Sequence, residues 1–84
     1  MGQKEKLIRR LRSHPRDFTF DEAQTLLRYL GFERSNKGAT SGSRVLFVRK
    51  DGGALWIHIP HPGKELHSYQ VKELIKMLEQ EGLI

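Results

Sequence analysis

Residues 44–59 read RVLFVRKDGGALWIHI, and this stretch decides the fold. Val, Ile, Phe and Trp are concentrated on both sides of Asp51-Gly52-Gly53, which is the composition of two antiparallel strands joined by a tight turn. A two-residue turn at Asp51-Gly52 pairs position 44 with 59, 46 with 57 and 48 with 55, and a turn at Gly52-Gly53 keeps the same faces. A three-residue turn would change them. One face is then predicted to be aliphatic, with Leu46, Val48, Leu55, Ile57 and Ile59. The other is predicted to be aromatic and basic, with Val45, Phe47, Arg49, Trp56 and His58.

An amphipathic helix is predicted on each side of these strands. Before them, Thr19-Phe20-Asp21-Glu22 has the form of a capping box, and apolar residues recur at helical spacing up to Gly31. After them, Ser68 is the predicted N-cap of a helix that ends at Gly82, beyond which the chain can fold back. The two apolar stripes consist of Ala23, Leu26, Leu27 and Leu30 in the first helix and of Val71, Leu74, Ile75 and Leu78 in the second.

Two shorter elements complete the predicted order. Residues 32–34 form a short strand, and residues 4–12 form a basic amphipathic helix that stops before His14-Pro15. This helix is either an anchoring arm for RNA or a membrane surface, or a surface helix that docks Leu7, Ile8 and Leu11 on the core. The predicted fold class is α+β, with helices on one face of a three-stranded antiparallel sheet and an extra N-terminal helix.

Length, charge and composition narrow the class of protein. A chain of 84 residues predicts one domain, in which residues 1–16 form a basic helix and linker and residues 17–84 form the core. The chain has no cysteine, no apolar run that could span a bilayer and no signal-peptide pattern, so we expect a cytoplasmic protein that does not enter a membrane. Residues 1–16 carry a net charge of +5 and residues 33–50 a net charge of +4, whereas the remaining two segments are acidic. A polyanion is expected to meet the two basic segments.

Histidines and a lysine cluster in residues 58–64, which read HIPHPGK. A ribonuclease that works without metal needs one group to take the proton of the ribose 2′-OH, one to protonate the leaving 5′-oxygen, and a cation beside the phosphorane. Histidine can perform either proton transfer near neutral pH. His58 is therefore the first catalytic candidate and His61 the second, unless His58 is only a cross-strand neighbour of Val45 and His61 only a turn residue. The candidates to hold phosphate are Arg44, Arg49 and Lys64.

Other polar features predict binding and no metal. His58, His61 and His67 have no cysteine or carboxylate to complete a zinc signature, so we expect no metal and no cofactor. The polar loop 35–43 can face phosphate oxygens, although solvent-exposed loops have the same composition. Trp56 and Phe47 can stack on bases, whereas an exposed tryptophan is also typical of a protein-partner hot spot. The candidate RNA-binding residues in the loop are Lys37, Gly42 and Ser43.

Three segments together resemble the HicA family of mRNA interferase toxins. They are residues 40–47, TSGSRVLF, residues 56–66, WIHIPHPGKEL, and the helix end EGLI at residues 81–84. The Pro-His-Pro turn after a strand is the most specific part, and Gly42-Ser43 is the second. The resemblance covers about residues 20–84 and implies a fold like the double-stranded-RNA-binding domain, which agrees with the order of elements above. Residues 17–84 are then a HicA-like core.

The resemblance also implies a function. It implies the toxin of a type II toxin–antitoxin system, a metal-independent endoribonuclease that cleaves mRNA and that a HicB-like antitoxin inhibits. The family's usual catalytic histidine directly follows Gly-Ser, and this chain has Arg44 there. Because arginine cannot act as a general base at neutral pH, we expect His58 to take this role, with His61 as second choice. A non-catalytic RNA-binding module is the alternative, and a protein-interaction domain that uses the Trp56 face is a third hypothesis.

Overall fold

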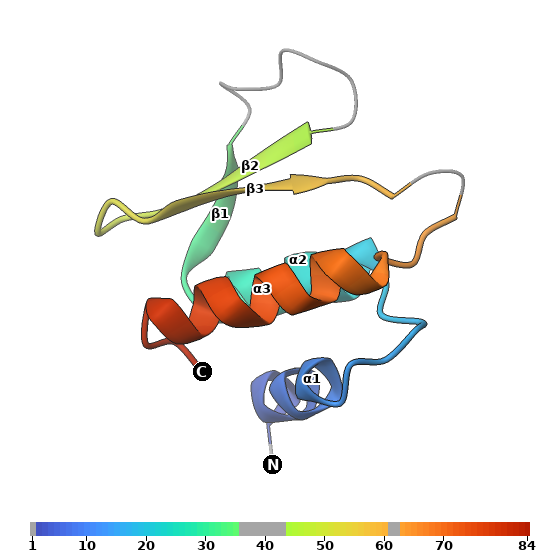
Figure 1. Ribbon diagram of the computed structural model, residues 1–84. Coiled ribbons are helices and arrows are strands. Elements are labelled where there is room, and N and C mark those ends of the chain that lie inside the picture. The colour runs from blue at the N-terminus through green and yellow to red at the C-terminus, as the bar shows by residue number, and fades with distance from the viewer. Residues whose placement is uncertain (1, 36–43, 61–62) are drawn as a thin grey trace.

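The computed structural model describes residues 2–35, 44–60 and 63–84 (Figure 1). Within these residues the chain forms three helices and one antiparallel sheet of strand order β1-β2-β3. The α+β class and the order of elements are therefore as predicted, and α2 to α3 follow the order of the double-stranded-RNA-binding domain. In chain order the elements are α1 (Gln3–Arg12), α2 (Phe20–Tyr29), β1 (Phe32–Ser35), β2 (Arg44–Arg49), β3 (Ala54–His58) and α3 (Ser68–Gln80).

The elements form three layers. Figure 1 shows α2 and α3 on one side of the sheet and α1 beyond these two helices, on the side away from the strands. Helix α1 contacts both α2 and α3. No helix of the described residues covers the other face of the sheet, which we call the open face. From the register of the strands, the open face carries Glu33, Ser35, Arg44, Leu46, Val48, Ala54, Trp56 and His58.

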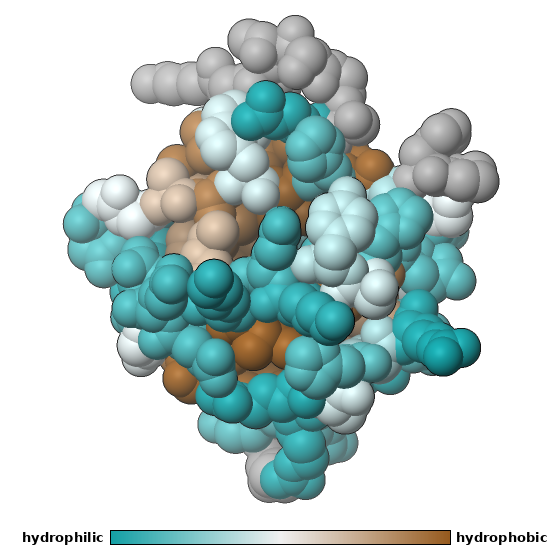
Figure 2. Space-filling model, viewed as in Figure 1, coloured by the Kyte–Doolittle hydropathy of each residue, from teal (hydrophilic) through white to brown (hydrophobic). Residues whose placement is uncertain are grey.

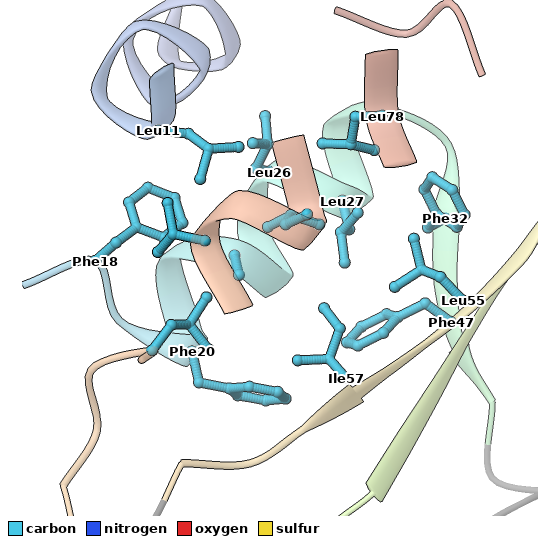
Figure 3. Packing of buried hydrophobic residues seen from close by; sticks show 14 of the residues in the cluster. Leu11, Phe18, Phe20, Leu26, Leu27, Phe32, Phe47, Leu55, Ile57 and Leu78 are labelled. Atoms are coloured by element: carbon cyan, nitrogen blue, oxygen red, sulfur yellow. The ribbon is translucent and has the colours of Figure 1, made fainter. Parts of the chain in front are cut away.

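Apolar side chains from the sheet and from all three helices form the core (Figure 3). The two predicted helical stripes are confirmed, because each of their residues is buried. Phe47 is fully buried under the helices, and its ring centroid lies 6.3 Å from that of Phe20. The strands add Phe32, Val45, Leu55 and Ile57 to this cluster.

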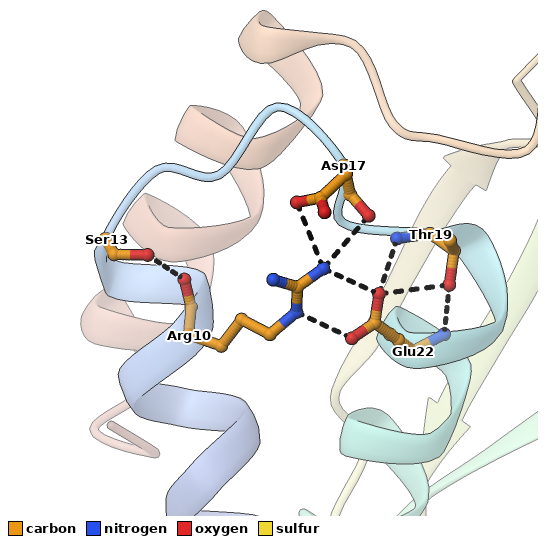
Figure 4. Close-up of polar contacts among 5 residues, drawn as sticks. All are labelled: Arg10, Ser13, Asp17, Thr19 and Glu22. Carbon is orange, nitrogen blue, oxygen red and sulfur yellow. Dashed lines mark hydrogen bonds and ion pairs between the residues drawn. The ribbon is translucent and has the colours of Figure 1, made fainter.

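The predicted capping box at the start of α2 is present, and α1 attaches to it (Figure 4). The Thr19 hydroxyl accepts a hydrogen bond from the Glu22 N–H at 3.0 Å, and the Glu22 carboxylate accepts one from the Thr19 N–H at 3.0 Å. Arg10 Nε donates to Glu22 Oε2 at 2.7 Å, and Arg10 Nη2 donates to Asp17 Oδ1 at 3.1 Å. This hydrogen bond from Arg10 lowers the pKa of the Glu22 carboxyl below its ordinary value, against the opposing effect of partial burial.

Helix α1 docks on the core through its apolar side. Leu7 and Leu11 are buried, and Ile8 is partly buried against the same cluster. An ion pair of 3.1 Å between Arg12 and Glu79 adds a link to α3. His14, with φ of 54°, then reverses the chain toward α2. Of the two alternatives for this helix, the docking of its aliphatic residues is therefore observed.

The turn between β2 and β3 has three residues, so the predicted two-residue turn is wrong. Gly52 N donates to Arg49 O at 3.1 Å, and Arg49 N donates to Gly53 O at 2.7 Å. Gly52 has φ of +102°, in the left-handed region that favours glycine. Lys50, Asp51 and Gly52 thus form a type I turn followed by a glycine bulge.

This one-residue difference in the turn moves β2 to the opposite face relative to β3. The observed partners are Arg44 with His58, Leu46 with Trp56 and Val48 with Ala54. The predicted grouping of Val45, Phe47 and Arg49 with Trp56 and His58 is therefore wrong, and so is the predicted placement of Leu46 and Val48 on one face with Leu55 and Ile57. A one-residue change in register exchanges the faces because side chains alternate along a strand.

The chain between β3 and α3 is fixed to the start of α2. Phe20 N donates to Lys64 O at 2.9 Å, and Leu66 N donates to Phe18 O at 2.7 Å. The N-cap of α3 is His67, one residue before the predicted Ser68. At its other end Leu83 N donates to Leu78 O at 2.9 Å, and Leu83 and Ile84 pack against the core as predicted.

Candidate nucleic-acid interface

Three predicted site residues meet at one end of the open face. Arg44 lies directly opposite His58 across the β2–β3 ladder. The Arg44 guanidinium carbon lies 4.7 Å from the centroid of the Trp56 ring, a cation–π distance. All three side chains are exposed, and Trp56 exposes 42% of its surface. We call this group the Arg44–Trp56–His58 cluster.

The strand register explains why the cluster is compact. The bond from Arg49 N to Gly53 O marks a hydrogen-bonded pair next to the turn. Hydrogen-bonded and non-hydrogen-bonded pairs alternate along an antiparallel ladder, so Arg44 and His58 form a non-hydrogen-bonded pair. Side chains of such pairs approach most closely, with Cβ atoms about 4.5–5.5 Å apart. A group bound to Arg44 therefore lies within reach of the His58 imidazole.

Hydrogen bonding fixes the backbone of the cluster while its side chains stay open. The Gln70 side-chain amide donates to His58 O at 2.9 Å, which ties the end of β3 to α3. In the described part of the chain, no carboxylate pairs with Arg44. The Arg44 guanidinium thus keeps hydrogen-bond donors for an anion while one of its faces stacks on Trp56.

An apolar groove runs along the outer edge of β3, between this strand and α3. Figure 2 views this side of the molecule and shows apolar surface gathered beside the strands. Tyr69 is 56% exposed at its rim and stacks on His67, with ring centroids 5.8 Å apart. The groove is lined by Leu55, Trp56, Ile57, His58, Leu66, Tyr69, Gln70, Glu73, Leu74 and Met77.

Tyr69 and Gln70 line this groove and are not among the residues predicted from the sequence. Tyr69 lies outside the apolar stripe of its helix, and this position alone predicts that its aromatic ring is exposed. Gln70 is 8% exposed, accepts a hydrogen bond from His67 N at 2.9 Å and donates to His58 O. No sequence signal identifies this role, because it depends on the distance between α3 and the edge of the sheet.

Two predicted members of the interface lie elsewhere. Arg49 is on the helix side of the sheet, where its guanidinium carbon lies 5.6 Å from the Phe32 ring centroid and it pairs with Asp51 at 3.2 Å. Phe47 is fully buried, so it cannot stack on a base. Both errors follow from the register. Lys64 lies in the segment that joins β3 to α3, where its backbone oxygen accepts a hydrogen bond from Phe20 N.

Four predicted site residues lie outside the described residues. They are Lys37, Gly42, Ser43 and His61. Gly42 and Ser43 directly precede Arg44 in the chain, and His61 follows His58 by three positions.

Among the described residues, no group of three or more His, Asp or Glu side chains could hold a metal ion. No helix in the same part of the chain is both long and apolar enough to cross a membrane.

Comparison with protein families adds independent information. A family model described as the HicA toxin of bacterial toxin–antitoxin matches residues 20–83, which is most of the chain. The chain belongs to the HicA toxin family. No curated protein and no solved structure matches it. Membership of the HicA family gives the chain the role of a toxin with a cognate antitoxin and an RNA target, and α1 precedes the part that matches.

Proposed function

We propose that this HicA-family toxin is a metal-independent endoribonuclease that cleaves mRNA in the cytoplasm and is inhibited by a HicB-like antitoxin. The observation that carries the proposal is the Arg44–Trp56–His58 cluster. It places a cation, an aromatic ring and an imidazole together on a sheet face that no described helix covers. The imidazole supplies one of the two proton-transfer groups that cleavage through the ribose 2′-OH requires, and the arginine supplies the cation beside the phosphorane.

The proposed reaction assigns one proton transfer to each of two histidines. The 2′-oxygen of the ribose attacks the adjacent phosphorus, its proton passes to an imidazole, and the bond from phosphorus to the 5′-oxygen breaks. The products are a 2′,3′-cyclic phosphate and a 5′-hydroxyl, which receives a proton from a second acid. His58 serves as the general base or the general acid, and His61 is the candidate for the other role.

Arg44 and Trp56 position the substrate. The guanidinium fork of Arg44 matches the oxygens of the phosphorane and stabilises their developing charge. The exposed indole of Trp56 stacks on a neighbouring unpaired base, as aromatic residues do in proteins that bind single-stranded RNA. Lys37, Gly42, Ser43 and Lys64 are proposed further contacts to phosphate.

The test is cleavage of a labelled single-stranded RNA in EDTA by wild type and by His58→Ala. We expect the substitution to lower the cleavage rate by about 10²-fold to 10⁴-fold, because it removes a general acid–base group. RNA affinity should change by only a few fold, since His58 acts in the transition state. His61→Ala, assayed in parallel, shows whether a second imidazole takes part. Thr25→Ala is the control, because Thr25 is exposed on α2, which lies on the other side of the sheet from the cluster.

Two results would reject the catalytic proposal. One is unchanged cleavage by His58→Ala, and the other is loss of wild-type cleavage in EDTA. Retarded but intact RNA with wild type would favour the alternative, a non-catalytic RNA-binding module. The arginine in place of the family's usual histidine is the observation that favours this second function. Arg44→His then provides a direct comparison, because cleavage only by this variant would assign the loss of activity to Arg44.

A further inference from the structure

The cations of the N-terminal segment fall into two groups. Arg10 pairs with Glu22 and Asp17, and Arg12 pairs with Glu79, so these two arginines attach α1 to the rest of the chain. The others are exposed. Among the described residues, no carboxylate pairs with Lys4, Lys6 or Arg16. We call these three cations the α1 cations, although Arg16 lies just after the helix, and none of them forms an ion pair with a described carboxylate that would attach α1 to the rest of the chain.

The described part of the open face carries little positive charge. Arg49 lies on the other side of the sheet, so Arg44 is the cation that the described residues place on the open face. The negative charge of Glu33 on the same face opposes the positive charge of Arg44. By contrast, residues 1–16 hold a net charge of +5, which equals that of the whole chain. Affinity for a nucleic acid depends mainly on the number of phosphates that cations neutralise. Beyond the proposed contacts of Lys37 and Lys64, a protein that binds RNA through this open face gains affinity from cations elsewhere on its surface.

Lys4 and Lys6 belong to α1, the layer farthest from the open face in Figure 1, and Arg16 belongs to the segment that joins α1 to α2. Their helix cannot also insert into a membrane, because Leu7 and Leu11 are buried against the core. A membrane-surface helix needs an apolar face that remains available to lipid. A phosphate backbone, in contrast, requires only exposed cations and no apolar face.

We propose that α1 and the turn after it form a second RNA-binding surface, which holds the phosphate backbone outside the cleaved segment. Lys4, Lys6 and Arg16 make these contacts without regard to base sequence. The inference rests on the proposed RNA-cleaving function and extends it to a part of the chain that the HicA family model does not cover. The longest Cα extent of the molecule is 35 Å. At about 3.4 Å per phosphate, an RNA needs about 10 nucleotides to span this length.

The test compares two triple variants that remove equal charge. Lys4→Gln/Lys6→Gln/Arg16→Gln removes the α1 cations, and Lys50→Gln/Lys72→Gln/Lys76→Gln removes three exposed cations from the hairpin turn and α3. Binding of a single-stranded RNA of about 30 nucleotides is measured against salt concentration, and a short RNA of about 5 nucleotides serves as the length control.

For the long RNA, the first variant should reduce the slope of log K against log[salt] by about 2, since each single-strand phosphate contact contributes about 0.7. Its affinity near 0.05 M salt should fall by about tenfold or more. The control variant should change the slope by less than about 0.7.

The outcomes separate this inference from the proposed function. Equal effects of the two triple variants on the long RNA overturn the second surface, even if His58→Ala still abolishes cleavage. A loss specific to the α1 variant supports the surface, even if His58→Ala cleaves normally and the catalytic proposal fails. An equally large loss on the short RNA also overturns it, because that RNA cannot reach both surfaces. The second surface is also overturned if wild type binds vesicles of phosphatidylglycerol and the α1 variant does not, because the partner of α1 is then a membrane.

Discussion

Arg44 stacks on Trp56 and lies opposite His58, so its planar shape matters as much as its charge. A lysine keeps the charge but has neither the planar surface for stacking nor the fork that matches two phosphate oxygens. We predict that Arg44→Lys lowers RNA affinity by about tenfold. The measurement is titration of a non-cleavable 2′-deoxy analogue, with Arg34→Lys as control. Arg34 lies on the helix side of the sheet and bonds to Gln24, so equal losses in both variants would contradict the role of Arg44.

Glu22 makes the stability of the molecule depend on pH. Its pKa is lowered in the folded state by the hydrogen bond from Arg10, whereas in the unfolded chain the pKa returns to the ordinary value of a glutamate. A lowered pKa in the folded state means that the unfolded state binds the proton more tightly. The stabilisation is therefore complete above the pKa of the unfolded state and is lost as the pH falls through the pKa of the folded state. We predict that acidification from about pH 6 to about pH 3 destabilises wild type more than Glu22→Gln.

Urea unfolding at several pH values checks this prediction. Glutamine at position 22 still suits a capping box, so the variant should fold and lose mainly the ion pair with Arg10. Asp21→Asn is the control, because Asp21 is an exposed neighbouring carboxylate in the same first turn of α2. Parallel pH dependence of wild type and Glu22→Gln would show that this carboxylate does not contribute.

At the scale of elements, the β2–β3 hairpin depends on one glycine. Gly52 has φ of +102° in the three-residue turn, and open space surrounds the position where a Cβ would lie. The cost of Gly52→Ala is therefore backbone strain alone, which we predict to be about 1–2 kcal/mol of unfolding free energy. Gly53→Ala is the matched control, because a Cβ there meets its neighbours at 3.4 Å or more, and it should cost less than about 0.5 kcal/mol. Equal costs in urea unfolding would mean that the turn has a different conformation.

Helix α1 is an integral element of the fold, although the family model begins after it. Its Leu11 side chain is completely buried, and its Arg10 completes the polar network at the start of α2. A short basic helix of this kind is marginally stable alone, and here tertiary packing supplies its stability. The same packing leaves the α1 cations on the outside, which makes α1 both a structural layer and the proposed second RNA-binding surface.

At the scale of the whole molecule, the open face is where a cognate antitoxin would inhibit the toxin most directly. We predict that the antitoxin covers the Arg44–Trp56–His58 cluster with acidic side chains, because this blocks the substrate by both shape and charge. Trp56 is the only tryptophan in the chain and reports on its face specifically. With 5-fluorotryptophan incorporated into the toxin alone, its ¹⁹F signal should shift on complex formation and become protected from solvent. An unshifted, solvent-accessible signal in a complex that still blocks RNA binding would place the antitoxin elsewhere.

The local sequence determined which elements form and in what order. Thr19 and Glu22 specify a helix start through two reciprocal hydrogen bonds, and the apolar periodicity of α2 and α3 selects the side that packs on the sheet. These features depend on residues a few positions apart, so the sequence is sufficient to predict them. The presence of Trp56 and His58 on one face also follows from their spacing of two within a strand.

The tertiary structure decided which residues lie beside Trp56 and His58. Asp51-Gly52-Gly53 is compatible with turns of two or three residues, and the burial of Val45 and Phe47 on the same face as Leu55 and Ile57 requires the longer one. That choice brings Arg44 to the cluster and sends Arg49 to the other side, because one residue in the turn inverts the alternation of the whole strand. The contact of Gln70 with β3 and the docking of α1 likewise join residues distant in the chain, and no local pattern encodes such distances.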